Sequence, residues 1–108
     1  MRRSSSRDLP DLLELEILER AQDDIFNIIE YGTQTHGEDV ARAYIGKIGA
    51  RINWLRENPR LGPVHSELQG GIRSFRQGQH RIYYRSNSAK LTVIRVLHLA
   101  MDVPSQFD

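Results

Sequence analysis

The side chains best suited to binding or moving charge lie close together near the end of the chain: Arg73, Arg76, Arg81, Tyr83, Arg85, Arg95 and His98. Guanidinium groups bind phosphates and carboxylates through charge-assisted hydrogen bonds. A histidine can act as an acid or a base and a tyrosine can donate a proton, so this set could support cleavage of a phosphodiester. Each group also has a structural role open to it, because tyrosine is common in strands and a histidine at a strand end often packs or caps.

Three short β-type runs joined by two turns position these residues: strands at 72–76, 80–85 and 91–98, and turns at 77–79 and 86–88. Gly78 can adopt a positive φ in the first turn, so the first two runs predict a β-hairpin. The last run is apolar at both its odd-numbered and its even-numbered positions, apart from Thr92 and Arg95. A strand covered on one face alternates, and this pattern therefore predicts a central strand covered on both faces.

The pairing of the hairpin decides where its charges point. A two-residue turn at Gly78 places one set of side chains on one face of the sheet: Ser74, Arg76, Arg81, Tyr83 and Arg85. Phe75, Ile82 and Tyr84 then share the opposite face, with Arg73 at its rim. One face is expected to pack a core and the other to present charge, unless a bulge moves one strand's set across the sheet.

The N-terminal half predicts a strand and two helices. Leu13, Leu15 and Ile17 alternate with glutamates, which indicates a strand at 13–17; a helix start is the alternative, because Leu and Glu are good helix formers. Apolar stripes at helical spacing follow over residues 19–35 and 38–58. The two helices are expected to pack as an antiparallel hairpin that covers a sheet. Gly46 and Gly49 are expected to allow close approach of another helix or of the sheet.

Length and composition limit the possible classes. A chain of 108 residues fits one domain, here residues 11–108, after a disordered stretch at 1–10. The absence of cysteine excludes disulfides and thiolate zinc sites and permits a reducing cytoplasm. Because no apolar run is long enough to span a bilayer and no secretory signal is seen, no membrane role is expected. The four histidines lie far apart, so neither a metal nor a cofactor is expected.

Charge is distributed unevenly along the chain. Residues 11–58 hold five basic and ten acidic side chains, a net charge of −5, whereas residues 59–108 hold seven basic and three acidic ones, a net charge of +4. A basic surface commonly contacts nucleic acid or an acidic protein segment, although it can also be no more than a solvated face. Both helices are acidic, so no basic recognition helix is available for direct DNA binding.

Five short segments together resemble the ParE branch of the ParE/RelE toxin superfamily: AxxDI from Ala21, ENPRLG from Glu57, IRSF from Ile72, GQHRIYYR from Gly78, and IRVLH from Ile94 followed by Met101-Asp102. The resemblance covers residues 13–107. It implies an α+β fold in which an antiparallel helical hairpin packs on one face of a three- to four-stranded twisted antiparallel sheet. Two features depart from the family pattern: Ala100 stands where an arginine is usual, and about ten extra residues precede the first strand.

The resemblance also implies a function. Members of this branch are toxins of two-gene type II toxin–antitoxin systems, associated with inhibition of DNA gyrase by binding rather than by catalysis. The implied partner is a ParD-like antitoxin in a hetero-oligomer, with DNA contacted only through that antitoxin. The alternatives are a ribosome-dependent mRNA interferase of the RelE kind and a non-toxic antitoxin-binding module. The RelE-like lysine cluster and tail tyrosine have no counterpart, because the only lysines are Lys47 and Lys90.

No catalytic residue is therefore assigned, and the expected partner-binding residues are Arg73, Arg76, Arg81, Tyr83, Arg85, Arg95, His98, Met101, Val103 and Phe107. An acidic antitoxin segment would place carboxylates and apolar anchors on the arginine-bearing face. Arg73 and Arg95 have an alternative role, which is to tie the sheet together internally. Met101, Val103 and Phe107 belong to a short tail that could dock on the body of the domain or on a partner.

Overall fold

A computed structural model describes residues 12–107, so the expected disorder of residues 1–10 lies outside the described residues. The elements follow one another as β1 (Glu14–Ile17), α1 (Glu19–His36), α2 (Glu38–Glu57), β2 (Arg73–Gln77), β3 (His80–Ser86), β4 (Lys90–His98) and the short α3 (Val103–Gln106). Residues 13–17 were open to two interpretations, and the strand is confirmed. The helical boundaries predicted from sequence lie within a residue or two of those observed.

The four strands form one sheet in the order β1-β4-β3-β2. The two hairpins are antiparallel, but β1 runs parallel to β4, so the sheet is mixed rather than wholly antiparallel. The helical hairpin explains the difference. It returns the chain to the end of the sheet where β1 began, so that β2 and, after two tight turns, β4 run in the direction of β1.

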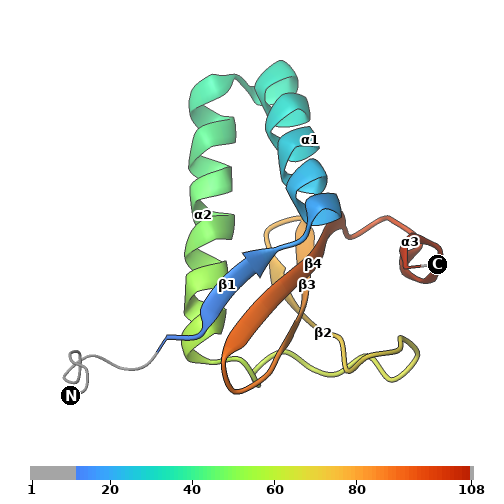
Figure 1. Cartoon of the computed structure of the whole chain (residues 1–108). Coiled ribbons are helices and arrows are strands. Elements are labelled where there is room, and N and C mark those ends of the chain that lie inside the picture. The colour runs from blue at the N-terminus through green and yellow to red at the C-terminus, as the bar shows by residue number, and fades with distance from the viewer. Residues whose placement is uncertain (1–11, 108) are drawn as a thin grey trace, which may run out of the picture.

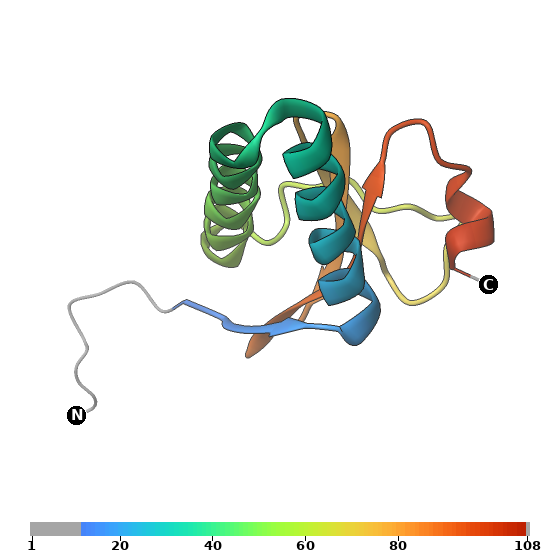
Figure 2. The ribbon, with the colours of Figure 1, turned by 90° about the horizontal axis from the view of Figure 1, so that it is seen from above.

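The helical hairpin covers one face of the sheet, as Figure 1 shows. Viewed from above, α1 and α2 lie on one side of the strands, while the loop before β2 and the C-terminal tail lie on the other (Figure 2). Between helices and sheet, the main core contains Ala21, Ile48, Ile52, Leu55, Ile82, Tyr84, Leu91, Val93 and Val96. Burying such side chains supplies most of the driving force for folding.

One expectation about the second helix is wrong. Gly46 and Gly49 are exposed, and a Cβ added at either would meet nothing within 4 Å. Each follows a core-facing isoleucine by one residue, and one residue rotates the side-chain direction by about 100° away from the core. The close contact between the helices lies at Gly32 instead, where an added Cβ would be 3.2 Å from the Cβ of Ala41.

The central position of β4 is confirmed. It lies between β1 and β3, and its side chains are buried on both faces of the sheet. β1 pairs only with Lys90 to Val93, so the edge of β4 is open beyond that point. There Asp24 of α1 takes the place of a neighbouring strand, because its Oδ2 accepts the backbone N–H of Val96 at 2.9 Å.

The outer edge of β1 is also protected by side chains. The Leu13 carbonyl accepts a hydrogen bond from Arg56 Nε at 2.8 Å, and the Ile17 carbonyl accepts one from Gln22 Nε2 at 2.8 Å. Unpaired carbonyls on an edge strand would otherwise invite pairing with another chain. The two helices therefore cover the sheet and also block this edge.

Candidate partner-binding face

The sheet face opposite α1 and α2, called the far face below, carries the side chains predicted to share it. Ser74 pairs with Tyr83 and Arg76 pairs with Arg81, while Phe75 pairs with Ile82 on the helix side. A two-residue turn produces this register, and Gly78 adopts a φ of 62° within it. A Cβ at Gly78 would lie 2.6 Å from the Tyr44 ring, so the turn needs glycine for both reasons.

A bulge in β4 adds Arg95 to the far face. Tyr83 pairs with Arg95 and Tyr84 with Val93, which leaves Ile94 as an extra residue between the two pairs. Ile94 and Arg95 consequently both lie on the side away from the helices. An insertion of this kind leaves one residue unpaired and bends the strand.

The middle of the far face is filled by the chain itself. Ile72, Tyr83 and Leu97 form a second buried cluster, packed by Leu68, Ile94, Val103 and Phe107. The rings of Phe107 and Tyr83 meet edge to face with centroids 5.3 Å apart. Tyr83 is only 2% exposed, and burial raises the pKa of its hydroxyl. Of the two docking modes left open for Val103 and Phe107, the structure therefore shows packing on the body of the domain.

A polar cluster lies beside these aromatic rings, and sequence reasoning missed it; its Ser74 is buried, its His65 is half-buried and its Glu67 is exposed. His65 Nε2 is 2.6 Å from the Oγ of Ser74, which is fully buried, and His65 Nδ1 is 3.2 Å from Glu67 Oε2. The pKa of Glu67 is lowered by its own backbone N–H and then by His65. The far-face position of Ser74 was predictable. Its partner lies in an irregular loop, whose course no periodicity reveals.

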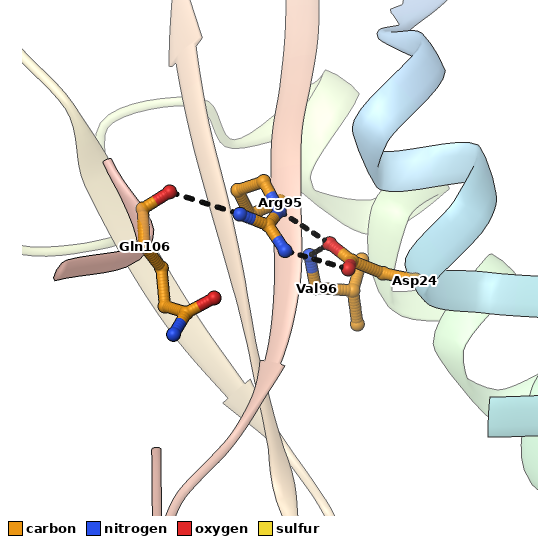
Figure 3. A network of polar contacts seen from close by, with 4 residues as sticks. All are labelled: Asp24, Arg95, Val96 and Gln106. Atoms are coloured by element: carbon orange, nitrogen blue, oxygen red, sulfur yellow. Dashed lines mark hydrogen bonds and ion pairs between the residues drawn. The ribbon is translucent and has the colours of Figure 1, made fainter. Parts of the chain in front are cut away.

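Arg95 holds three elements together, as Figure 3 shows. Its Nε and Nη2 donate to the two carboxylate oxygens of Asp24 at 2.7 and 2.9 Å, and its Nη1 donates to the Gln106 carbonyl at 2.9 Å. The hydrogen bond to Asp24 raises the pKa of Arg95, and both side chains are nearly buried. The bidentate pair joins β4 to α1, and the bond to Gln106 adds α3, so Arg95 and Asp24 of the family-like segments act together in the fold.

Arg73 joins β2 to the loop that follows α2. Its Nη1 donates to the carbonyls of Arg60 and Gly62, at 3.1 and 2.7 Å. Tyr84 binds the same loop, because its hydroxyl donates to the Pro59 carbonyl at 2.9 Å and accepts the Gly62 N–H at 3.1 Å. Arg73 and Arg95 thus have the internal role considered from sequence, and whether they also touch a partner stays a prediction.

His98 lies on the other side of the sheet from the arginines. It pairs with His80, whose Nδ1 is 2.6 Å from the Tyr44 hydroxyl of α2, and the two imidazole centroids are 5.3 Å apart. His98 Nδ1 accepts a hydrogen bond from the Ala100 N–H at 3.0 Å, which holds the start of the C-terminal tail close to the end of β4. His98 and the far-face arginines therefore do not converge on one point.

Four of the predicted contact residues are exposed: Arg76, Arg85, His98 and Met101, the last with 46% of its surface accessible. Arg81 is half-buried. Arg76 Nε donates to the Gly78 carbonyl at 2.9 Å, which leaves its two terminal amino groups free of that bond. Within residues 12–107 no group of three or more His, Asp or Glu side chains could hold a metal ion. No helix in that range could cross a bilayer.

Solved structures of other proteins share this architecture. A chain from the chromosomal ParDE toxin–antitoxin system of P. aeruginosa has a TM-score of 0.68 and 17% sequence identity over 81% of this chain and 96% of that chain. A chain of the YoeB dimer from Staphylococcus aureus has a TM-score of 0.59 and 17% identity over 82% and 98%. These likenesses show the α+β fold of RelE/ParE-like toxins.

The sequence places the chain more narrowly. The profile of the family described as ParE toxin of type II toxin-antitoxin system, parDE, matches residues 15–103. Toxin ParE1 of Mycobacterium tuberculosis is 35% identical over 68 residues, which is 62% of this chain and 69% of that protein. Toxin ParE3 of Caulobacter vibrioides is 30% identical over 73 residues, or 68% and 73%. The chain therefore belongs to the ParE family of type II toxins, which confirms the resemblance seen in its motifs.

Proposed function

We propose that this ParE-family toxin inhibits DNA gyrase by protein–protein binding and is neutralised by a ParD-like antitoxin encoded beside it. The observation that carries the proposal is that the far face has a centre covered by the chain itself and a margin that carries arginine side chains. Its centre is closed by the chain's own tail, while Arg76 and Arg85 are exposed and Arg81 is half-buried. Arg76 donates one hydrogen bond, from its Nε to the Gly78 carbonyl of its own turn, and its terminal amino groups stay at the surface. Cations left at a surface in this way favour contact with a carboxylate-bearing polypeptide.

The surface chemistry supports binding rather than catalysis. Tyr83 is buried and His98 lies across the sheet from the arginines, so these two groups do not form one site with the exposed guanidinium groups. A binder that blocks an enzyme needs area and complementary charge rather than a reactive group. The relatives and the solved structures with toxin–antitoxin partners fit this function, which would be exerted in the cytoplasm.

Induced expression tests the toxin and its antidote together. Cells that express this chain alone should stop growing, and co-expression of the small neighbouring gene should restore growth through a complex that co-purifies. Normal growth with a tight complex would instead indicate a non-toxic antitoxin-binding module. Ala100 would be consistent with that outcome, because an arginine is usual at this position of the tail. Absence of both arrest and complex would overturn the proposal.

The mRNA interferase of the RelE kind is not favoured by any observation on the far face. It predicts cuts in ribosome-bound transcripts that disappear in a His98→Ala variant. Intact transcripts in a translation extract, together with inhibited supercoiling by gyrase, are the result expected for the proposed function. Cleavage that depends on His98 would contradict it.

A further inference from the structure

One side of the helical hairpin carries apolar side chains that are open to solvent. Phe26 and Ile29 are three residues apart on α1 and therefore lie on the same face of that helix. They are 59% and 37% exposed. The ends of α1 and α2 that meet at Gly37 extend beyond the strands, so the sheet does not cover them (Figure 1). Apolar side chains that gather on an exposed surface in this way mark a site of interaction.

A hollow of about 260 Å³ lies beside Phe26, in the groove between the two helices. It is lined by Ile29, Thr33, Glu38, Ala41, Arg42 and Ile45. Its wall is mostly apolar, and the exposed ion pair of Glu38 and Arg42 stands at its rim. A cavity of about 150 Å³ is large enough to hold benzene, so a phenyl ring fits here. Phe26 and this hollow together form the hairpin face.

We infer that the hairpin face binds a second copy of the same chain, with Phe26 of each copy in the hollow of the other. Phe26 stands about one helical turn from Ile29 in the wall of the hollow, so each copy offers both a projecting ring and a place for one. A two-fold axis between the ring and the hollow brings both pairs together, with the two α1 helices antiparallel. Such a self-complementary contact closes after two copies and leaves no open end.

Charge on the two helices favours this occupant. α1 has four acidic and one basic side chains, whereas α2 has three acidic and four basic ones. The exposed Asp23 and Glu30 lie three residues before and four residues after Phe26, on the same side of α1. A Phe26 ring that enters the hollow therefore brings a carboxylate towards Arg42. The exposed pair of Arg42 with Glu38 contributes little, so Arg42 can turn to the second copy at small cost.

The paired toxin keeps its far face free. The helical hairpin and the far face lie on opposite sides of the strands (Figure 2), so the two surfaces can be occupied independently. The inference consequently goes beyond the proposed function. A contact made by one ring and one hollow on each copy is small, and small interfaces are weak and transient. We therefore expect a dimer whose population depends on protein concentration.

Self-association of the full chain is the first test. Sedimentation velocity from about 5 to about 500 µM should show the wild type passing from monomer to dimer. Phe26→Ser should weaken association about tenfold or more, because it removes the ring that fills the hollow. Tyr31→Ser is the control, since Tyr31 is a 69% exposed aromatic of the same helix that does not line the hollow. Thermal unfolding of the dilute proteins checks that both variants fold.

Two results of this experiment would overturn the inference. One is a wild type that remains monomeric over the whole range. The other is a loss of association in Tyr31→Ser as large as that in Phe26→Ser. A monomeric wild type that binds the co-encoded antitoxin, with a complex that Phe26→Ser abolishes, would assign the hairpin face to the antitoxin instead of a second copy. Because no growth or gyrase assay is involved, failure here is distinguishable from failure of the proposed function.

Disulfide cross-linking is the second test, and the natural chain is suited to it because it has no cysteine. Phe26→Cys is mixed with Arg42→Cys in the presence of oxidised glutathione, and Tyr31→Cys mixed with Arg42→Cys is the control. A disulfide needs Cα atoms within about 7 Å of each other, so only residues that meet across the contact are joined efficiently. The first mixture should form the disulfide between the two variants about tenfold faster than the control. Equal rates in the two mixtures would overturn the pairing of Phe26 with the hollow.

Discussion

Several residues of the family-like segments make contacts inside the fold that hold its elements together. Asp24 and Arg95 form a nearly buried bidentate pair, and Arg73, Tyr84 and Gly62 fix the loop before β2. The arginines of residues 73–95 therefore have two roles: Arg73 and Arg95 form hydrogen bonds within the fold, whereas Arg76 and Arg85 lie at the surface. For Arg73 and Arg95 the sequence allowed either partner binding or hydrogen bonding within the fold. It could not decide between them, because the acceptors, the Gly62 carbonyl and the Asp24 carboxylate, are distant along the chain.

The Asp24–Arg95 pair gives a prediction at this scale. Asp24→Ala leaves the Arg95 charge and the Val96 N–H without their acceptor in a nearly buried site. Removing one partner of such a pair should lower the free energy of unfolding by about 3 kcal/mol. Urea denaturation measures the loss, with Asp23→Ala, an exposed neighbour on the same helix, as the matched control. Similar stabilities of the two variants would contradict the structural role of Asp24.

His80 predicts a dependence of stability on pH. Burial lowers the pKa of His80 below its usual 6.5, the nearby His98 lowers it further, and Asp24 acts in the opposite direction. The unfolded chain therefore binds a proton at a higher pH than the folded one. Stability contributed by neutral His80 is present above pH 6.5 and is lost as the pH falls through the lowered pKa of the folded state.

The His80→Asn variant isolates this effect, because the asparagine amide can keep a hydrogen bond with the Tyr44 hydroxyl without titrating. Urea unfolding at a series of pH values should show a smaller loss of stability below pH 6.5 in His80→Asn than in the wild type. Parallel curves for the two proteins would show that His80 does not titrate differently on folding.

At the scale of elements, the hydrophobic period was the most informative feature of the sequence. It located both helices, all four strands and the central place of β4, since burial on one or two faces leaves its pattern directly in the residue order. The parallel pairing of β1 with β4 follows from the path of the helical hairpin through space. The bulge at Ile94 and the covering of the far face by residues 63–72 also depend on contacts between distant segments, and no local pattern encodes them.

The exposed glycines of α2 give a prediction at the scale of elements. Gly46→Ala and Gly49→Ala should each raise the free energy of unfolding by about 1 kcal/mol, because alanine is the better helix former and the new methyl group meets open space. Gly32→Ala is the control and should gain less, since its Cβ would press on Ala41. Destabilisation by Gly49→Ala would contradict the prediction, because it would mean that another molecule packs against this surface of α2.

The protected edge of β1 gives a second prediction at the scale of elements. Arg56→Ala combined with Gln22→Ala removes the side chains that bind the Leu13 and Ile17 carbonyls. An edge strand with free carbonyls pairs more readily with a second chain, so the double variant should self-associate more than the wild type in sedimentation velocity. Arg42→Ala, which loses only an ion pair within α2, is the control. Unchanged sedimentation of the double variant would mean that these hydrogen bonds do not protect the edge.

At the scale of the whole molecule, charge and layers coincide. The acidic helices cover one face of the sheet, while the basic half supplies β2, β3, β4, the covering loop and the tail (Figure 2). Composition along the chain indicated this division before any contact was known. It could not indicate that the tail closes the centre of the far face, because Val103 and Phe107 are two apolar residues in an otherwise unpatterned segment. The surface left to a partner is consequently narrower than the sequence suggested.

Inhibition of purified DNA gyrase tests the central claim most directly. Supercoiling of relaxed plasmid is followed with increasing amounts of the full chain, alone and after addition of the co-encoded antitoxin. The account predicts that supercoiling falls as the protein is added, that the antitoxin restores it, and that added RNA remains intact. Undiminished supercoiling by gyrase, with a protein that nevertheless arrests growth in cells, would contradict the proposed target.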